Sequence, residues 1–64
     1  MYIPVVRERV RIAGRSGLFL VMRVDREAEI AELVGLDAEA YVSSEEVPFA
    51  MLLPYKPDAP SRPD

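Results

Sequence analysis

The chain has no cysteine, no histidine and no tryptophan among its 64 residues, and only 3 glycines. Without cysteine it forms no disulfide, and a structural zinc site would have to use carboxylates alone, which zinc rarely does. General acid–base catalysis most often uses histidine, and covalent catalysis often uses cysteine. The composition therefore predicts a protein that is not an enzyme and that uses no metal and no cofactor.

Long apolar runs are also missing, since no uninterrupted segment approaches the ~20 residues of a membrane-spanning helix. Arginines interrupt the N-terminal segment MYIPVVRERV, where a signal peptide would be apolar. We therefore expect a cytoplasmic protein without membrane contact. The net charge of -3 disfavours non-specific binding to nucleic acid, which normally requires a basic excess.

The size of the chain allows one domain, and a domain of this size buries roughly 60% of the surface of its unfolded chain. Half of the residues are hydrophobic (50%), which is too many for a disordered chain. Because neither disulfide nor metal reinforces the domain, self-association into a homo-oligomer follows as a hypothesis. Residues 56–64 contain no large apolar side chain, and they predict a disordered Pro-rich tail after a domain of residues 1–55.

Two segments near the N-terminus have the pattern of β-strands. In residues 2–13, apolar and basic side chains alternate in part, with the period of a half-buried strand. The apolar members are Val6, Val10 and Ile12, and the basic members are Arg7, Arg9 and Arg11. Turn residues follow at 14–17, and residues 18–24, LFLVMRV, form an apolar run typical of a central strand.

Residues 27–36 fit two structures. As a helix, the segment has Asp25 as its N-cap and Gly35 at its end, which gives a small α+β fold with a helix at 26–34. As a strand, it places Ala31 and Leu33 on one face of a hairpin with LFLVMRV. We favour the strand, because LFLVMRV needs a neighbour for its backbone groups.

The C-terminal third predicts short elements. Residues 36–40 indicate a hairpin tip, 41–43 a short strand and 44–46 a turn. Pro48 is tolerated at a helical start, so we expect a 3-10 turn over 49–52 before a last strand at 53–55.

The segment RVRIAGRSGLFLVMRVDREAEIAEL resembles the first hairpins of the KOW and Tudor branch of SH3-like barrels. The matching positions are Val10, Ile12, Gly14, Gly17, Val21, Val24 and Asp25. The later VPFAMLLP is similar to the way such barrels close, with a short 3-10 turn before the final strand. The resemblance covers residues 5–55 and implies an all-β fold, a five-stranded SH3-like barrel with a short 3-10 turn before the last strand.

The resemblance also implies a habit of binding, since KOW domains commonly contact RNA or ribosomal and transcription proteins, and Tudor domains commonly bind peptides. A methyl-lysine reader needs a cage of aromatic side chains, and this chain has few aromatics to spare from its core (8%). The plasmid-encoded dihydrofolate reductases are similar small barrels that catalyse from a tetramer. Their Val-Gln-Ile-Tyr pore strand has no counterpart here, where the region reads VPFAML.

Two sets of residues are candidate binding sites. Arg7, Arg9, Arg11 and Arg23 form a basic set whose spacing can follow a phosphate backbone. The alternative for these arginines is an ordinary solvated face that pairs with Glu27, Glu29 or Glu32. The apolar set of Phe49, Met51 and Leu53 is a candidate protein-binding surface.

We therefore expect a non-catalytic interaction module that binds a protein partner or itself. The alternative is a nucleic-acid-binding, KOW-like module that uses its arginine-bearing strand, and the third hypothesis is an oligomeric enzyme.

Overall fold

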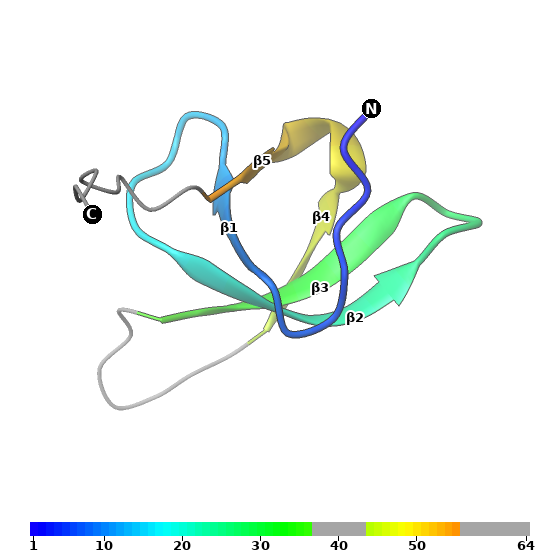
Figure 1. The fold of residues 1–64 in the computed structure, drawn as a ribbon, viewed down its shortest axis with the longest axis horizontal. Coiled ribbons are helices and arrows are strands. Elements are labelled where there is room, and N and C mark those ends of the chain that lie inside the picture. Colours follow the sequence, from blue (N-terminus) through cyan, green and yellow to red (C-terminus); the bar gives the residue numbers. More distant parts are fainter. Residues whose placement is uncertain (37–43, 56–64) are drawn as a thin grey trace, which may run out of the picture.

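The computed structural model describes residues 1–36 and 44–55. Over these residues the chain forms β1 (Arg9–Ile12), β2 (Phe19–Asp25), β3 (Ile30–Gly35), β4 (Glu45–Pro48), the 3-10 turn η1 (Phe49–Met51) and β5 (Leu52–Pro54). The strands form one antiparallel sheet in the order β4-β3-β2-β1-β5 (Figure 1). The predicted all-β fold with a 3-10 turn before the last strand is confirmed. The alternative helix at 26–34 is wrong.

The sheet curls strongly but does not close. Figure 1 shows β1 and β5 on one side of the molecule and the long β2–β3 hairpin sweeping beneath them. The two edge strands of the described part, β4 and β5, are joined through η1 and do not pair with each other.

The β2–β3 hairpin explains why the strand prevails over the helix. In β3, Ala31 and Leu33 are each 1% exposed, and they face Val24 and Val21 across the ladder. Asp25, the expected N-cap, instead accepts hydrogen bonds from the backbone N–H of Glu27 and Ala28 through Oδ1, at 3.1 and 3.0 Å. An aspartate carboxylate that accepts hydrogen bonds from the next backbone N–H groups occurs both at the start of a helix and in a tight turn. Here the pairing of β3 with β2 gives the turn.

A β-bulge interrupts the β2–β3 register between Val21 and Arg23. Val21 is fully buried, so strict alternation would also turn Arg23 toward the core. The extra residue, Met22, shifts this alternation, and Arg23 lies opposite Glu32 on the outside of the sheet.

The first strand is shorter than predicted. Residues 2–8 are not a strand, and Val6 is 47% exposed instead of sharing the buried face of Val10 and Ile12. A turn replaces the strand, with the Glu8 N–H donating to the Val5 carbonyl at 3.0 Å and the Val5 N–H donating to Glu8 Oε1 at 2.9 Å. The turn satisfies locally the backbone groups that a longer strand would have paired.

The predicted turn at 44–46 is also wrong, because Glu45 and Glu46 belong to β4. Val47, 5% exposed, anchors this strand in the core opposite Ala31. The last strand runs over 52–54, one residue earlier than expected. The predicted strand at 41–43, the hairpin tip beyond Leu36 and the tail at 56–64 lie outside the described residues.

The core lies inside the curl of the sheet and draws on every strand and on η1. Its buried members are Val10, Ile12, Phe19, Val21, Ala31, Leu33, Val47, Phe49 and Leu52. Tyr2 and Val24 pack against this cluster. Within the described ranges no polar or charged residue is buried, so the polar and charged side chains described below lie at or near the surface.

Candidate interaction surface

The side of the sheet turned away from the core is called the outer face below. Strand alternation and register place on it Arg9, Arg11, Leu20, Met22, Arg23, Glu32, Val34, Glu46 and Leu53.

Two of the predicted arginines stand on β1. Arg9 and Arg11 are exposed and alternate with the buried Val10 and Ile12. Arg9 lies opposite Leu20 of β2, and Arg11 lies opposite Leu53 of β5. Both arginine side chains therefore lie beside an apolar side chain of a neighbouring strand, Leu20 for Arg9 and Leu53 for Arg11.

Arg7 extends this basic row from the turn before β1. Its backbone has φ 79, and its N–H donates to the Val21 carbonyl at 2.7 Å, which ties the turn to β2. The Val21 N–H in turn donates to the Glu8 carbonyl at 3.0 Å.

Over residues 1–36 and 44–55, no ion pair involves Arg7, Arg9 or Arg11. The predicted pairing of these arginines with Glu27, Glu29 or Glu32 is thus not formed in the described part of the chain.

An open groove lies between this turn and β2. It is lined by Val6, Arg7, Leu20, Val21 and Met22. Val6 and Met22 are each 47% exposed, so the groove presents apolar side chains to solvent beside an arginine. Apart from Arg7, these residues were not among the predicted binding residues. The alternation of LFLVMRV around the buried Val21 was the signal that could have placed Leu20 and Met22 outside.

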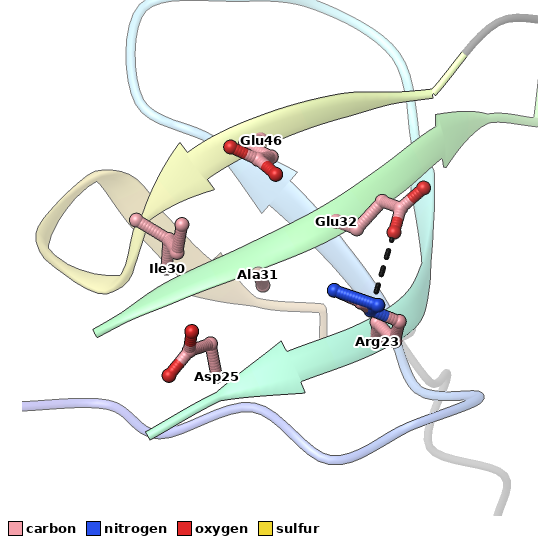
Figure 2. A pocket seen from close by; sticks show the side chains of 6 residues that line it. All are labelled: Arg23, Asp25, Ile30, Ala31, Glu32 and Glu46. Carbon is pink, nitrogen blue, oxygen red and sulfur yellow. Dashed lines mark ion pairs between the residues drawn. The ribbon is translucent and has the colours of Figure 1, made fainter. Parts of the chain in front are cut away.

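Arg23, the fourth predicted arginine, belongs to a different part of the outer face. Its Nε lies 3.5 Å from Oε1 of Glu32 (Figure 2), whereas Arg7, Arg9 and Arg11 form no ion pair with any described residue. Asp25 and Glu46 line the same hollow, but among the described residues Arg23 forms an ion pair with Glu32 alone. Glu32 and Glu46 lie directly opposite each other, a like-charge pair that is unfavourable across strands.

This hollow is too small for an organic ligand. Its volume is about 30 Å³, far below the roughly 300–1,000 Å³ of a small-molecule pocket. No group of three or more metal-binding side chains comes together in the described part of the chain, so these carboxylates do not form a cation site there.

The predicted protein-binding set is divided between core and surface. Phe49 is 2% exposed and packs in the core, so it has no free surface for a partner. Met51 and Leu53 are 41% and 47% exposed. Leu53 joins the outer face beside Arg11, while Met51 lies on η1, where its carbonyl accepts a hydrogen bond from the Ala13 N–H at 2.8 Å.

Arg15 makes the tightest ion pair of the described residues, and it lies away from the outer face. Its guanidinium donates to both carboxylate oxygens of Glu45, at 2.6 and 3.4 Å, and lies 5.2 Å from the centre of the Phe19 ring. The carboxylate raises the pKa of Arg15 above its ordinary value. The pair links the β1–β2 turn to the start of β4 and covers Phe19 at the end of the core.

Among the described residues, Tyr2 also has an altered pKa. Burial disfavours its phenolate, and the neighbouring Glu8 carboxylate adds to the effect, so that the pKa rises from 10.0 to about 12. The hydroxyl oxygen is inaccessible to solvent and makes no hydrogen bond of standard geometry within the described part. The arm before the first turn thus packs a neutral phenol against the core.

The sequence matches no protein-family model, and neither a curated protein nor a solved structure is significantly similar to it. The part of the chain that the structure describes contains no candidate membrane-spanning helix.

Proposed function

We propose that this chain is a non-catalytic module that binds another protein chain through its outer face. One observation carries the proposal: half-exposed apolar side chains line a groove beside arginines that no described carboxylate neutralises. Exposed apolar surface rimmed by charge is typical of protein-binding sites, and arginine is enriched in them. The absence of histidine and cysteine from the whole sequence supports a role without catalysis.

We further infer that the fold is an SH3-like barrel of the KOW or Tudor type. The antiparallel run from β1 to β4, the 3-10 turn η1 and the return of β5 to β1 support this inference. An aromatic cage for methyl-lysine is not part of the proposal, because Phe19 and Phe49 are buried and Tyr2 packs on the core.

Site-specific photocrosslinking tests the proposal in cells. Benzoylphenylalanine in place of Met22 or Leu53, both on the outer face and 47% exposed, should form crosslinks to protein. The same group in place of Ala28, which is exposed in the β2–β3 turn, is the matched control and should form none. Crosslinks equal in yield at all three positions, or none at Met22 and Leu53, would contradict the proposal.

Nucleic-acid binding is the second candidate function. The observation that favours it is the row of Arg7, Arg9 and Arg11 without ion pairs in the described part of the chain. The net charge of -3 and the pairing of Arg23 with Glu32 weigh against it.

Fluorescence anisotropy with RNA and with duplex DNA separates the two functions. A nucleic-acid-binding module would bind at low ionic strength, lose affinity as salt rises, and lose it further in Arg9→Glu. The protein-binding proposal predicts no salt-sensitive binding to either nucleic acid.

A further inference from the structure

We infer that the groove between the first turn and β2 binds an extended acidic segment of a partner protein. An apolar side chain of that segment enters the groove, and its carboxylates pair with the arginines of β1. The inference rests on the proposed function, because it names the chemistry of the partner at the same surface. Three observations carry it: the apolar lining of the groove, the arginines that continue from it, and the backbone that holds both in place.

The groove offers an apolar surface that a partner side chain can cover. Its volume is about 440 Å³, and it is open to solvent. Val6 and Met22 are each 47% exposed and Leu20 is half-buried, so an apolar side chain laid among them removes apolar surface from water. Sites for small molecules usually enclose most of the ligand, whereas an open groove suits a chain segment that lies across the surface.

Arginines continue from the groove along β1 at the spacing of an extended chain. Arg7 lines the groove, and Arg9 and Arg11 follow on the exposed side of β1. These three residues are called the arginine row. Alternate residues of a strand lie about 6.7 Å apart on one face. An extended partner chain along β1 repeats this spacing, so its side chains two and four residues from the one in the groove lie beside Arg9 and Arg11.

The charge that complements the arginine row is negative, and the described residues do not supply it. No ion pair of the described part involves the row. Glu8, the acidic residue next to it in sequence, accepts the Val5 N–H through Oε1 at 2.9 Å and so closes its own turn. Glu32 and Glu46 belong to β3 and β4, which the curl of the sheet turns away from β1 (Figure 1). Carboxylates of a partner would therefore form strong charge-assisted hydrogen bonds with the row.

The backbone beside the groove is fixed before a partner binds. Arg7 has φ 79, its N–H donates to the Val21 carbonyl at 2.7 Å, and the Val21 N–H donates to the Glu8 carbonyl at 3.0 Å. These bonds tie the turn to β2, so little conformational freedom is lost when the groove is filled. A strained conformation that the surrounding structure holds in this way is characteristic of binding sites.

The lining favours a protein segment over a nucleic acid. Proteins that bind single strands stack bases on aromatic side chains, and none of the described residues that line the groove is aromatic. The net charge of -3 also opposes a polyanion, whereas a short acidic segment meets the arginine row alone.

Peptide binding to the full chain tests the inference by fluorescence anisotropy. The probe is a labelled peptide, ESESLSESE, which places glutamates two and four residues from its leucine in both chain directions. The control SESELESES has the same composition, but its glutamates lie on the opposite side of an extended chain from the leucine. The probe should bind about fivefold more tightly than the control, and replacing its leucine by serine should weaken binding by about fivefold or more. The basic peptide KSKSLSKSK should not bind.

Matched variants of the chain locate the binding at the groove. Arg9→Glu should weaken binding of the probe by about tenfold or more. Arg26→Glu makes the same change in the exposed β2–β3 turn and should alter binding by less than about twofold at physiological salt. Val6→Ser should weaken binding by about threefold or more. Val5→Ser is its control, because Val5 is 64% exposed and does not line the groove. Circular dichroism confirms that each variant retains the sheet.

Specific outcomes would overturn the inference. One is equal binding of the probe and its control, and another is unchanged binding in Arg9→Glu or Val6→Ser. A chain that binds none of the peptides but whose Met22 position crosslinks to other proteins would sink this inference and leave the proposed function standing. Self-association that Arg9→Glu abolishes, without peptide binding, would identify a second copy as the occupant and overturn this inference alone. Tighter binding of RNA or duplex DNA than of the probe would sink both.

Discussion

Two side-chain-bearing residues of the described chain hold a backbone conformation that favours glycine. Arg7 has φ 79 and Glu29 has φ 59. Each fixes a connection that the sheet needs: the Arg7 N–H bonds to β2, and the Glu29 carbonyl accepts the Phe49 N–H at 2.9 Å. Glu29 lies in the β2–β3 turn and is not one of the outer-face residues, so its conformational cost can be measured separately from any binding role.

Glu29→Gly should stabilise the protein. The left-handed conformation costs a residue with a Cβ roughly 1–2 kcal/mol. Glycine loses more entropy on folding and offsets about 0.5–1 kcal/mol of that relief, so we expect a net gain of about 0.5–1 kcal/mol. Urea denaturation measures it.

Glu27→Gly is the matched control, because it removes the same charge from the same turn at a residue without positive φ. It should destabilise the protein by about 0.5–1 kcal/mol. Equal effects of the two substitutions would show that the backbone at Glu29 is not strained.

Leu33 is one of the residues whose truncation should cost the most stability. It is 1% exposed at the centre of the core, so Leu33→Ala leaves a cavity and should cost about 2–5 kcal/mol, enough to unfold much of so small a domain. Leu36→Ala, at a position 44% exposed, should change stability by less than about 0.5 kcal/mol. Thermal melts followed by circular dichroism distinguish the two. A folded Leu33→Ala protein with unchanged melting would place Leu33 outside the core.

At the scale of elements, the β2–β3 hairpin depends on the carboxylate that closes its turn. Asp25→Ala removes the acceptor of the Glu27 and Ala28 N–H groups and should cost about 1 kcal/mol. Asp25→Asn keeps an oxygen in the same place and should recover most of the stability. If the alanine and asparagine variants melt together, the two hydrogen bonds contribute nothing.

The elements that the sequence predicts correctly are those in which local pattern and pairing agree. LFLVMRV is a strand by composition, and the alternation of Ala31 and Leu33 matches it across the ladder. Pro48 marks the start of η1. The prediction fails where backbone hydrogen bonds have a local alternative. The turn at Val5–Glu8 replaces a strand, and β4 replaces the turn suggested by Glu45 and Glu46.

The candidate surface was less predictable than the fold. Arg9 and Arg11 follow from simple alternation. The bulge at Met22, which turns Arg23 toward Glu32, leaves no mark in the sequence pattern. Phe49 belongs to the predicted apolar binding set, but η1 turns it into the core. The positions of Arg23 and Phe49 depend on the extra residue Met22 and on the turn η1, and neither can be recognised from the alternation of apolar and polar residues.

At the scale of the whole molecule, Tyr2 couples stability to alkaline pH. Its pKa is about 12 in the folded chain, against 10.0 for a tyrosine exposed to water, so the folded state holds this proton more tightly. The stability that this brings is complete below pH 10 and is lost as the pH rises toward 12, since the unfolded chain ionises first.

Tyr2→Phe should remove that part of the pH dependence. Below pH 10 it should cost little, because the buried hydroxyl makes no hydrogen bond of standard geometry in the described part. Between pH 10 and 12 its urea midpoint should fall less steeply than that of the unmodified protein. Parallel midpoint curves for the two proteins would contradict this assignment.

The pairing of β5 with β1 indicates the order in which the strands assemble during folding. The meander β1-β2-β3-β4 is assembled from neighbours in sequence, whereas β5 meets β1 only by closing a loop from Val10 to Pro54. Long loops close late, because their entropy is lost before their contacts are gained. We therefore expect the last strand to dock after the meander during folding, and its amides to exchange with solvent sooner than those at the middle of β2.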